Sequence, residues 1–260
     1  HIMSNTALIT GASAGIGREF ARYHASKGGN LVITARRSEE LEALKSELEA
    51  AHGIQVAAVP LDLGMQGGAE RLYGEVKDSG QQIDILINNA GFGGHGHFLD
   101  RELASDLAMI DLNVRSLVSL CHLVGQDMVA QGGGKILNVS STAAHMPGPL
   151  QATYFATKAF VSSFSQALDE ELRDKGVTVT ALEPGYVATE FAATADLEGT
   201  NLVKGKGATA ESAAKCGYDA MMDGKLTIIN EAQLSLMLNW FLPLIPRRAK
   251  LKMIRRMQEK

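Results

Sequence analysis

The 260-residue chain has little cysteine and little proline, with two and six residues respectively. Cys121 and Cys216 lie far apart and lack the spacing of metal ligands. This argues against a disulfide scaffold and a cysteine-based zinc site, and it favours a reducing compartment. A long hydrophobic run is also missing. The most apolar window, 234–246, is interrupted by an asparagine and two prolines and is too short to span a bilayer.

Neither a strong net charge nor a composition typical of disorder is present. The formal net charge is −4 at pH 7, which argues against a general nucleic-acid binder. With 45% hydrophobic residues, the chain can bury a large core, and its length suits one α/β domain. No secretory signal is visible, and His1 and Ile2 before Met3 are expected to be an expression remnant. We therefore expect a cytoplasmic protein.

The sequence does contain a regular alternation of short β-branched runs and longer amphipathic stretches. Runs that are apolar throughout are typical of parallel strands buried on both faces. With right-handed crossovers, this pattern predicts an α/β fold of the Rossmann type, a doubly wound seven-stranded parallel sheet with helices on both faces. The expected strands are 6–10, 31–35, 55–61, 83–87, 135–140, 177–182 and 226–229. The expected helices are 15–27, 38–51 with Ser38 as its cap, 69–78, 103–130 and 153–175. We expect a single domain over 3–230 and an apolar, then basic, helical tail over 231–260.

A glycine-rich motif follows the first expected strand and leads into the first helix. It reads Thr10-Gly11-Ala12-Ser13-Ala14-Gly15-Ile16-Gly17. Glycines let the backbone turn tightly and approach a pyrophosphate, and the helix N-terminus offers free N–H groups and a positive dipole end. The motif predicts a dinucleotide site, with an ordinary tight turn as the alternative. The candidate cofactor-binding residues are Gly11, Ser13, Gly15, Ile16 and Gly17.

Arg36 and Arg37 follow the second expected strand. Dinucleotide sites place an acid there for a ribose 2′-hydroxyl, or an arginine for a 2′-phosphate. Two guanidinium groups suit bidentate contact with a phosphate, so the pair predicts NADP(H) rather than NAD(H), with a solvated basic turn as the alternative. The ends of the third and fourth strands add further candidate cofactor contacts, which are Asp62, Asn89, Ala90 and Gly91.

Three residues near the fifth expected strand form a candidate catalytic set. Ser141 follows that strand, and Tyr154 and Lys158 lie four residues apart on one face of the next helix. A strand end and the adjacent helix start meet near the carboxyl edge of the sheet. Reduction of a ketone by hydride transfer leaves an alkoxide that needs a proton. Tyr154 can supply the proton if the cation of Lys158 lowers its pKa, and Ser141 can orient the carbonyl.

The motifs TGxxxGIG, NNAG, Ser-x₁₂-Tyr-x₃-Lys and PGYVAT occur in this order, and together they resemble the short-chain dehydrogenase/reductase superfamily over about residues 3–230. The resemblance implies that Tyr154 is the general acid/base, that Lys158 tunes its pKa and binds the nicotinamide ribose, and that Ser141 orients the carbonyl. It also implies that Asn113 holds a proton-relay water, and that Thr189 opens a substrate lid. Contacts to the nicotinamide end are implied for Pro184, Gly185, Val187 and Thr189.

We expect NADPH-dependent reduction of a small hydrophobic ketone to a secondary alcohol. The free ketone, the steroid and the 3-oxoacyl thioester stay open as substrates. His145 and Met146 are candidates for the substrate pocket beside Ser141 and Tyr154. A non-catalytic NADP-binding sensor or scaffold is the alternative from a different class, and the intact catalytic set argues against it. His95 and His97 have no third ligand, so no metal site is predicted.

Apolar residues surround much of the expected helices 103–130 and 153–175, which predicts a homodimer or homotetramer packed through them. The segment 247–260 carries seven lysines and arginines and one glutamate, a net charge of +6. Leu251, Ile254 and Met257 are expected to form an apolar stripe on this last helix. Three interpretations of the tail stay open. It packs over the substrate mouth or a sister subunit, it contacts an anionic surface such as the inner membrane, or it receives an acidic carrier or thioester phosphates.

Overall fold

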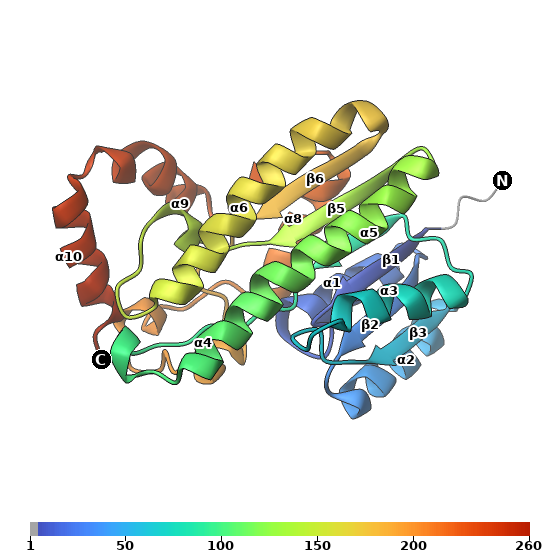
Figure 1. Ribbon diagram of the computed structural model, residues 1–260, viewed down its shortest axis with the longest axis horizontal. Coiled ribbons are helices and arrows are strands. Elements are labelled where there is room, and N and C mark those ends of the chain that lie inside the picture. Colours follow the sequence, from blue (N-terminus) through green and yellow to red (C-terminus); the bar gives the residue numbers. More distant parts are fainter. Residues whose placement is uncertain (1–4) are drawn as a thin grey trace.

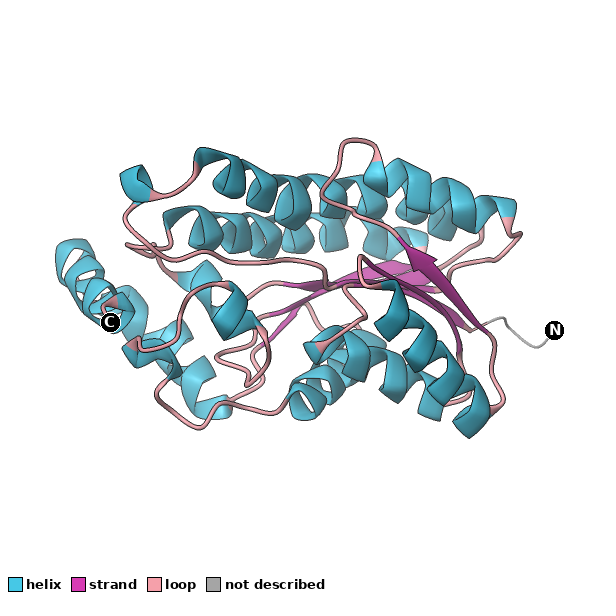
Figure 2. Cartoon of the chain, turned by 90° about the horizontal axis from the view of Figure 1, so that it is seen from below, coloured by secondary structure: helices cyan, strands magenta, loops and turns pink. Residues whose placement is uncertain are grey.

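The short apolar runs form one parallel sheet, and the amphipathic stretches form helices on both of its faces (Figures 1 and 2). The computed structural model describes residues 5–260, so the expectation for His1 to Met3 lies outside the described residues. The strands are β1 (Thr6–Thr10), β2 (Asn30–Ala35), β3 (Val56–Pro60), β4 (Ile85–Asn88), β5 (Gly134–Val139), β6 (Val177–Leu182) and β7 (Thr227–Ile228). Their spatial order is β3-β2-β1-β4-β5-β6-β7, and every neighbouring pair is parallel. The predicted fold class is confirmed.

Alternate residues of each strand feed two separate cores. In β1, Ala7 and Ile9 pack in one cluster while Leu8 packs in the other, and all three are fully buried. The first core is covered by α1 (Gly15–Ser26), α2 (Ser38–His52) and α8 (Ala210–Met222). The second is covered by α3 (Gly68–Asp78), α5 (Leu117–Ala130) and α6 (Ala152–Leu172). This two-sided burial explains why the strands read as continuous apolar runs.

The order of the strands reverses between β1 and β4, which are neighbours in the sheet. The chain moves outward from β1 to β3 and then returns to β4, so the loops after β1 and β4 diverge at the carboxyl edge. Open α/β sheets bind their ligands in the crevice formed at such a point. The candidate catalytic and cofactor residues all follow strand ends on this edge or lie on the helices that begin there.

Predicted element boundaries agree with the structure to within about two residues, with two informative differences. Ser38 is the first residue of α2 rather than its cap, and Arg37, at the cap position, makes no side-chain cap bond. Glu39 and Glu40 in the first turn supply favourable charge there instead. The expected helix 103–130 is continuous, but it comprises α4 (Leu103–Ile110), a π-helical segment (Asp111–Ser116) and α5.

The helix 103–130 is also long and apolar enough to cross a membrane by length and composition. Such a helix is weak evidence for a span, because core helices of soluble proteins meet the same test. Here α5 packs against α3 and the strands through residues such as Leu120, Val124 and Met128. It is part of a helix layer.

The tail folds back onto the domain at one end of the molecule (Figure 1). It consists of α9 (Ala232–Leu236), a π-helical segment (Met237–Phe241), a short 3₁₀ helix (Leu242–Leu244) and α10 (Arg247–Gln258). The inner stripe of α10 contains Leu251, Ile254 and Gln258, of which the last two are buried. Met257, which was expected in the stripe, is 40% exposed. The next residue after Ile254 that faces the domain lies four positions on, at Gln258, rather than three.

Candidate active site

Ser141, Tyr154 and Lys158 meet at the carboxyl edge of β5. Ser141 lies just beyond β5, where its hydroxyl accepts a hydrogen bond from the Ala143 N–H at 3.1 Å and caps a short 3₁₀ helix (Thr142–His145). The Ser141 hydroxyl is also close enough to that of Tyr154 to lower the tyrosine pKa by hydrogen bonding. Tyr154 and Lys158 are one turn apart on α6, and both are buried. The predicted proximity of the three residues is present in the structure.

Burial controls the protonation of both titratable members of this set. It raises the pKa of Tyr154 to about 12, against the opposing effect of the Ser141 hydrogen bond. It lowers the pKa of Lys158 to about 8. The expected lowering of the tyrosine pKa by Lys158 is therefore wrong for this arrangement. The ammonium group of Lys158 lies 5.8 Å from the centre of the Tyr154 ring and donates to the Val139 carbonyl at 2.9 Å. Loss of water on burial has the largest effect on the tyrosine pKa.

Asn113 lies in the π-helical segment, where a widened turn directs its buried side chain toward the loop after β4. Its amide donates to the Phe92 carbonyl at 2.9 Å and the Thr157 hydroxyl at 3.1 Å, and its oxygen accepts from the Phe92 N–H at 3.0 Å. A Cβ on Gly91 would lie 3.0 Å from this oxygen and 3.6 Å from the Lys158 nitrogen. Asn113 therefore braces the loop beside Lys158. The relay water implied for it stays a prediction.

The glycine motif turns sharply between β1 and α1. Gly11 and Gly15 have φ values of +64° and +54°, which L side chains rarely adopt. A Cβ on Gly17 would lie 2.2 Å from the Gly11 carbonyl oxygen, so this position tolerates no side chain. The amide of Asn89 donates to the Thr10 and Gly11 carbonyls at 3.2 Å each, which ties the end of β4 to the turn.

The two arginines after β2 have different environments. Arg37 is paired with Glu190 at 3.1 Å and with Glu40 at 3.6 Å, and it also reaches the Ser13 hydroxyl at 3.4 Å. Arg36 is exposed, and no salt bridge to it is found within residues 5–260. It is therefore the better placed of the two to meet an added phosphate.

The segment after β6 passes over the glycine turn. The Pro184 carbonyl accepts from the Thr142 N–H at 3.0 Å, which joins this segment to the Ser141 turn. Val187 forms an isolated β-bridge with Ala208, which joins the two ends of the segment between them. A Cβ on Gly15 would lie 3.4 Å from the Thr189 methyl group, so Thr189 lies directly above the turn. The segment after β6 and the glycine turn therefore lie together at the carboxyl edge of the sheet.

Four other predicted residues lie in the same region. The exposed carboxylate of Asp62, after β3, accepts from the Gly64 N–H at 2.9 Å. The Gly185 N–H donates to the Asn230 side chain at 3.2 Å. Ile16, on the first turn of α1, packs against the first core, and Ala90 packs against the second.

The two substrate-pocket candidates after Ser141 differ from each other. His145 Nε2 lies 2.6 Å from the carboxylate of Glu183, a residue that is only 3% exposed. The Ser162 hydroxyl donates to the same carboxylate at 2.7 Å. The Nε2 edge of His145 is therefore held by a buried acid, and the substrate contact expected for this residue stays a prediction. Met146 packs against the apolar cluster that contains Tyr154 and against the one that contains Leu242. It stays a candidate for the wall of the substrate pocket.

Sequence reasoning missed two walls of the site. The ring of Phe191, on the short helix α7 (Phe191–Thr194), lies 5.4 Å from the ring of Tyr154. Ile254 of α10 is buried in the same cluster as Tyr154 and Phe155. Both contacts join segments far apart in the sequence, so no local pattern indicates them. The apolar stripe predicted for the last helix was the one signal for Ile254.

The end of α10 is anchored beside this wall. The side-chain oxygen of the buried Gln258 accepts from the Gln151 amide at 2.6 Å. The backbone carbonyl oxygen of Gln258 lies 2.6 Å from His95 Nε2. Lys260 pairs with Asp196 at 2.6 Å. His95, one of the two loop histidines, therefore has a structural partner in the tail.

The arrangement fits a dinucleotide. The N-terminus of α1 makes no side-chain cap bond, the turn before it has no room for side chains at Gly11 and Gly17, and Arg36 adds a free cation after β2. Lys158 is a buried cation that donates one hydrogen bond to the Val139 carbonyl. An ammonium group has three N–H donors, so the others can donate to ribose hydroxyls.

Comparison with known proteins agrees with this geometry. A family model for short chain dehydrogenase matches residues 5–198. Serine 3-dehydrogenase from Agrobacterium fabrum is 39% identical over 191 residues, which cover 73% of this chain and 74% of that protein. Among solved structures, a short-chain dehydrogenase from Sphingobium yanoikuyae in complex with NADPH has a TM-score of 0.84 and 29% identity, with 98% of each chain covered. A bulky-bulky ketone specific alcohol dehydrogenase from Comamonas testosteroni has a TM-score of 0.77 and 27% identity, covering 94% of this chain and 95% of that one.

The buried charge of Lys158 gives a prediction about stability. Its pKa falls from an ordinary 10.5 to about 8 in the folded protein, so folding carries the cost of a buried charge below pH 8. Above pH 8 the folded state releases the proton first, and the cost disappears by pH 10.5. We expect Lys158→Met to be more stable than the wild type at pH 7, and this advantage to shrink by up to about 3 kcal/mol by pH 10.5.

Denaturant unfolding at a series of pH values measures this difference. Lys175→Met, which removes an exposed lysine at the end of the 3₁₀ turn after α6, controls for the loss of one charge. An advantage of Lys158→Met that stays constant across this pH range would contradict the burial of the ammonium group.

Proposed function

Because the chain belongs to the short-chain dehydrogenase family, we propose that it is an NADPH-dependent reductase that converts a hydrophobic ketone to a secondary alcohol. The observation that carries the proposal is the meeting of Ser141 with the buried Tyr154 and Lys158 at the carboxyl edge of β5. A sensor or scaffold would need none of the three.

The residues divide the chemistry between them. NADPH, when bound, supplies the hydride to the carbonyl carbon. The Ser141 hydroxyl orients the carbonyl oxygen, and Tyr154, whose pKa of about 12 keeps it protonated at neutral pH, donates its proton to that oxygen. Lys158 is charged below about pH 8 and stabilises the tyrosinate that remains. Water returns a proton to Tyr154 before the next turnover.

Two features support the choice of cofactor and substrate. Arg36 offers an unpaired guanidinium where a 2′-phosphate would lie, and the Sphingobium relative is described in complex with NADPH. Phe191, Met146, Phe155 and Ile254 surround Tyr154 with apolar side chains, which favours a hydrophobic carbonyl compound. The Comamonas relative is described as specific for bulky ketones. Reduction of a 3-oxoacyl thioester is the alternative substrate class.

We also propose a homodimer formed through α4 and α6. Three of the apolar residues expected to form the interface, Leu117, Leu120 and Val161, are buried within the monomer. Large apolar residues remain exposed on α4 and in the first half of α6. They are Leu103, Leu107, Ile110 and Phe160. Their exposure favours a sister subunit as partner, as oligomers bury such faces by two-fold symmetry.

Replacing Tyr154 by Phe tests the chemical step. The variant keeps the ring packing but has no proton to donate, so we expect ketone reduction to fall by about 10²–10⁴-fold. NADPH binding should persist, because the lost hydroxyl acts on the reacting carbonyl. Absorbance loss of NADPH with a panel of ketones and acyl thioesters, together with fluorescence titration of NADPH, measures both effects. Tyr73→Phe, on α3, is the control. Unchanged turnover in Tyr154→Phe contradicts the mechanism.

Arg36→Asp tests the phosphate site. A lost charge-assisted contact is worth about 1.5–3 kcal/mol, so the ratio of kcat/KM for NADPH to that for NADH should fall by about ten- to a hundredfold. Arg71→Asp makes the same change of charge on the exposed face of α3. A ratio that moves equally in both variants would show that Arg36 acts only through net charge.

The proposed dimer predicts that charges placed on its interface separate the subunits. We expect Leu107→Asp with Phe160→Asp to convert a dimer into a monomer, because two buried carboxylates per subunit would lose their hydration. Light scattering at micromolar concentration measures the mass. Met65→Asp, at another exposed apolar residue, is the control. A wild-type monomer at this concentration contradicts the proposal.

A further inference from the structure

The tail carries an apolar surface that nothing in the described structure covers. Its buried side contains Leu238 and Leu242, which pack on Ile229 and hold the segment to the domain. The opposite side carries five large apolar residues that are about half exposed or more. They are Leu236, Met237, Trp240, Phe241 and Leu244, with Trp240 71% and Leu244 79% exposed. We call these five residues the apolar tip.

A basic helix follows the apolar tip directly. After Pro246, α10 presents exposed lysines and arginines on its outer side while Ile254 and Gln258 face the domain. Residues 247–260 carry a net charge of +6 in a chain of total charge −4, so residues 1–246 carry −10. Figures 1 and 2 both place α10 at one end of the molecule, away from the N-terminal end. The charge of the protein is therefore unevenly distributed, and its cationic end lies next to the apolar tip.

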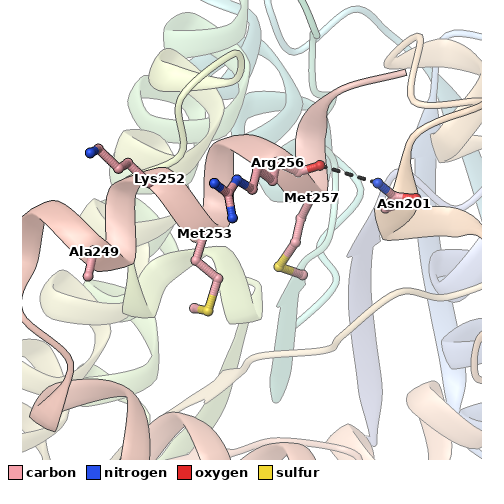
Figure 3. Close-up of a pocket in the computed structure, with 6 residues that line it drawn as sticks. All are labelled: Asn201, Ala249, Lys252, Met253, Arg256 and Met257. Carbon is pink, nitrogen blue, oxygen red and sulfur yellow. Dashed lines mark hydrogen bonds between the residues drawn. The ribbon is translucent and has the colours of Figure 1, made fainter.

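The outer side of α10 also forms a shallow groove of about 480 Å³ (Figure 3). Met253 and Met257 provide apolar lining, and Lys252 and Arg256 provide the charge. Asn201, whose amide donates to the Arg256 carbonyl at 3.3 Å, closes one end. Apolar surface bordered by cations is complementary to acyl chains beneath anionic headgroups.

Charge distinguishes between the partners that an exposed apolar surface can have. A second copy paired through the same surface by two-fold symmetry would bring one +6 tail close to another, which is unfavourable. An anionic bilayer attracts the tail and repels the acidic body, so it both binds the tip and orients the molecule. Tryptophan and phenylalanine beside a cluster of basic residues are typical of segments that lie in a membrane interface.

We infer that the apolar tip and the outer side of α10 together bind an anionic lipid surface peripherally, with Trp240 and Phe241 in the interface and Lys252 and Arg256 at the phosphates. The contact is separate from the catalytic set, whose neighbour in the tail is Ile254 on the inner side of α10.

Vesicle flotation of the full-length protein tests this inference. We expect binding to phosphatidylcholine vesicles that contain phosphatidylserine, weak or no binding to phosphatidylcholine alone, and release by high salt. Lys252→Glu with Arg256→Glu should weaken vesicle binding at least about tenfold. Each basic residue near an anionic surface raises the affinity about five- to tenfold, and this variant removes two of them. Arg71→Glu with Lys175→Glu makes the same change of net charge outside the tail and should bind nearly as the wild type does.

A second pair of variants tests the apolar contribution. Trp240→Ser with Phe241→Ser removes two exposed rings and should weaken vesicle binding at least about tenfold while leaving the melting temperature and ketone turnover in solution unchanged. Tryptophan fluorescence of the wild type should shift to the blue when phosphatidylserine vesicles are added, because Trp240 is the chain's one tryptophan.

Three results would overturn the inference. One is failure of the wild type to bind phosphatidylserine vesicles at low salt. Another is equal loss of binding in the tail pair and the control pair, which would show a response to net charge alone. The third is a fall in molecular mass of Trp240→Ser with Phe241→Ser on light scattering, which would assign the apolar tip to a second copy of the chain. Ketone turnover does not enter these three outcomes, so the proposed reaction can fail without changing them.

Discussion

The burial of Lys158 is the constraint on which the site depends. Its ammonium group has no carboxylate partner among the ion pairs of the described chain, and its recorded bond is to the Val139 carbonyl. An uncompensated buried cation is costly, so the surroundings must hold it in place against the tendency to reach water. In return, a lysine with a pKa of about 8 offers N–H donors at this place. Because this pKa is near neutral pH, a charged or polar group that arrives beside the lysine can change its protonation. The burial of Lys158 thus both lowers the stability of the fold and gives the lysine the properties that the proposed reaction uses.

Two buried polar networks provide that support from behind the sheet edge. In one, Ser140 bonds the Lys158 carbonyl at 2.9 Å and the Ser162 hydroxyl at 2.7 Å, and Ser162 continues to Glu183. In the other, the Asn138 side chain accepts from the Asn88 amide at 2.9 Å and donates to Ser165 on α6 at 2.9 Å. Both networks join β5 to α6, the two elements that carry Ser141, Tyr154 and Lys158. Buried hydrogen-bond networks fix the relative position of the elements they join, so these two position the candidate catalytic set.

What the sequence predicted and what it missed follow from the range of the interactions. The seven strands and the shared face of Tyr154 and Lys158 depend on local periodicity, and both are present in the structure. The partner of His145 could not be predicted, because Glu183 lies 38 residues further along and meets it only after β5 and β6 pair. The direction of the Tyr154 pKa was wrong for a similar reason. Spacing indicates a neighbouring cation but gives no measure of burial, which decides the sign here.

Helix α10 shows how one short segment serves two environments. Its inner positions contribute Ile254 to the cluster around Tyr154 and Gln258 to a buried amide contact, while its outer positions carry the cations of the proposed lipid contact. Because residues three and four apart share a helix face, twelve residues suffice to separate these functions. A bilayer that binds the outer side would lie about one helix diameter, roughly 10 Å, from the wall of the catalytic site. If the proposed hydrophobic ketone dissolves in that bilayer, it would cross little water to reach Tyr154, and the two faces of α10 would then serve the same proposed reaction.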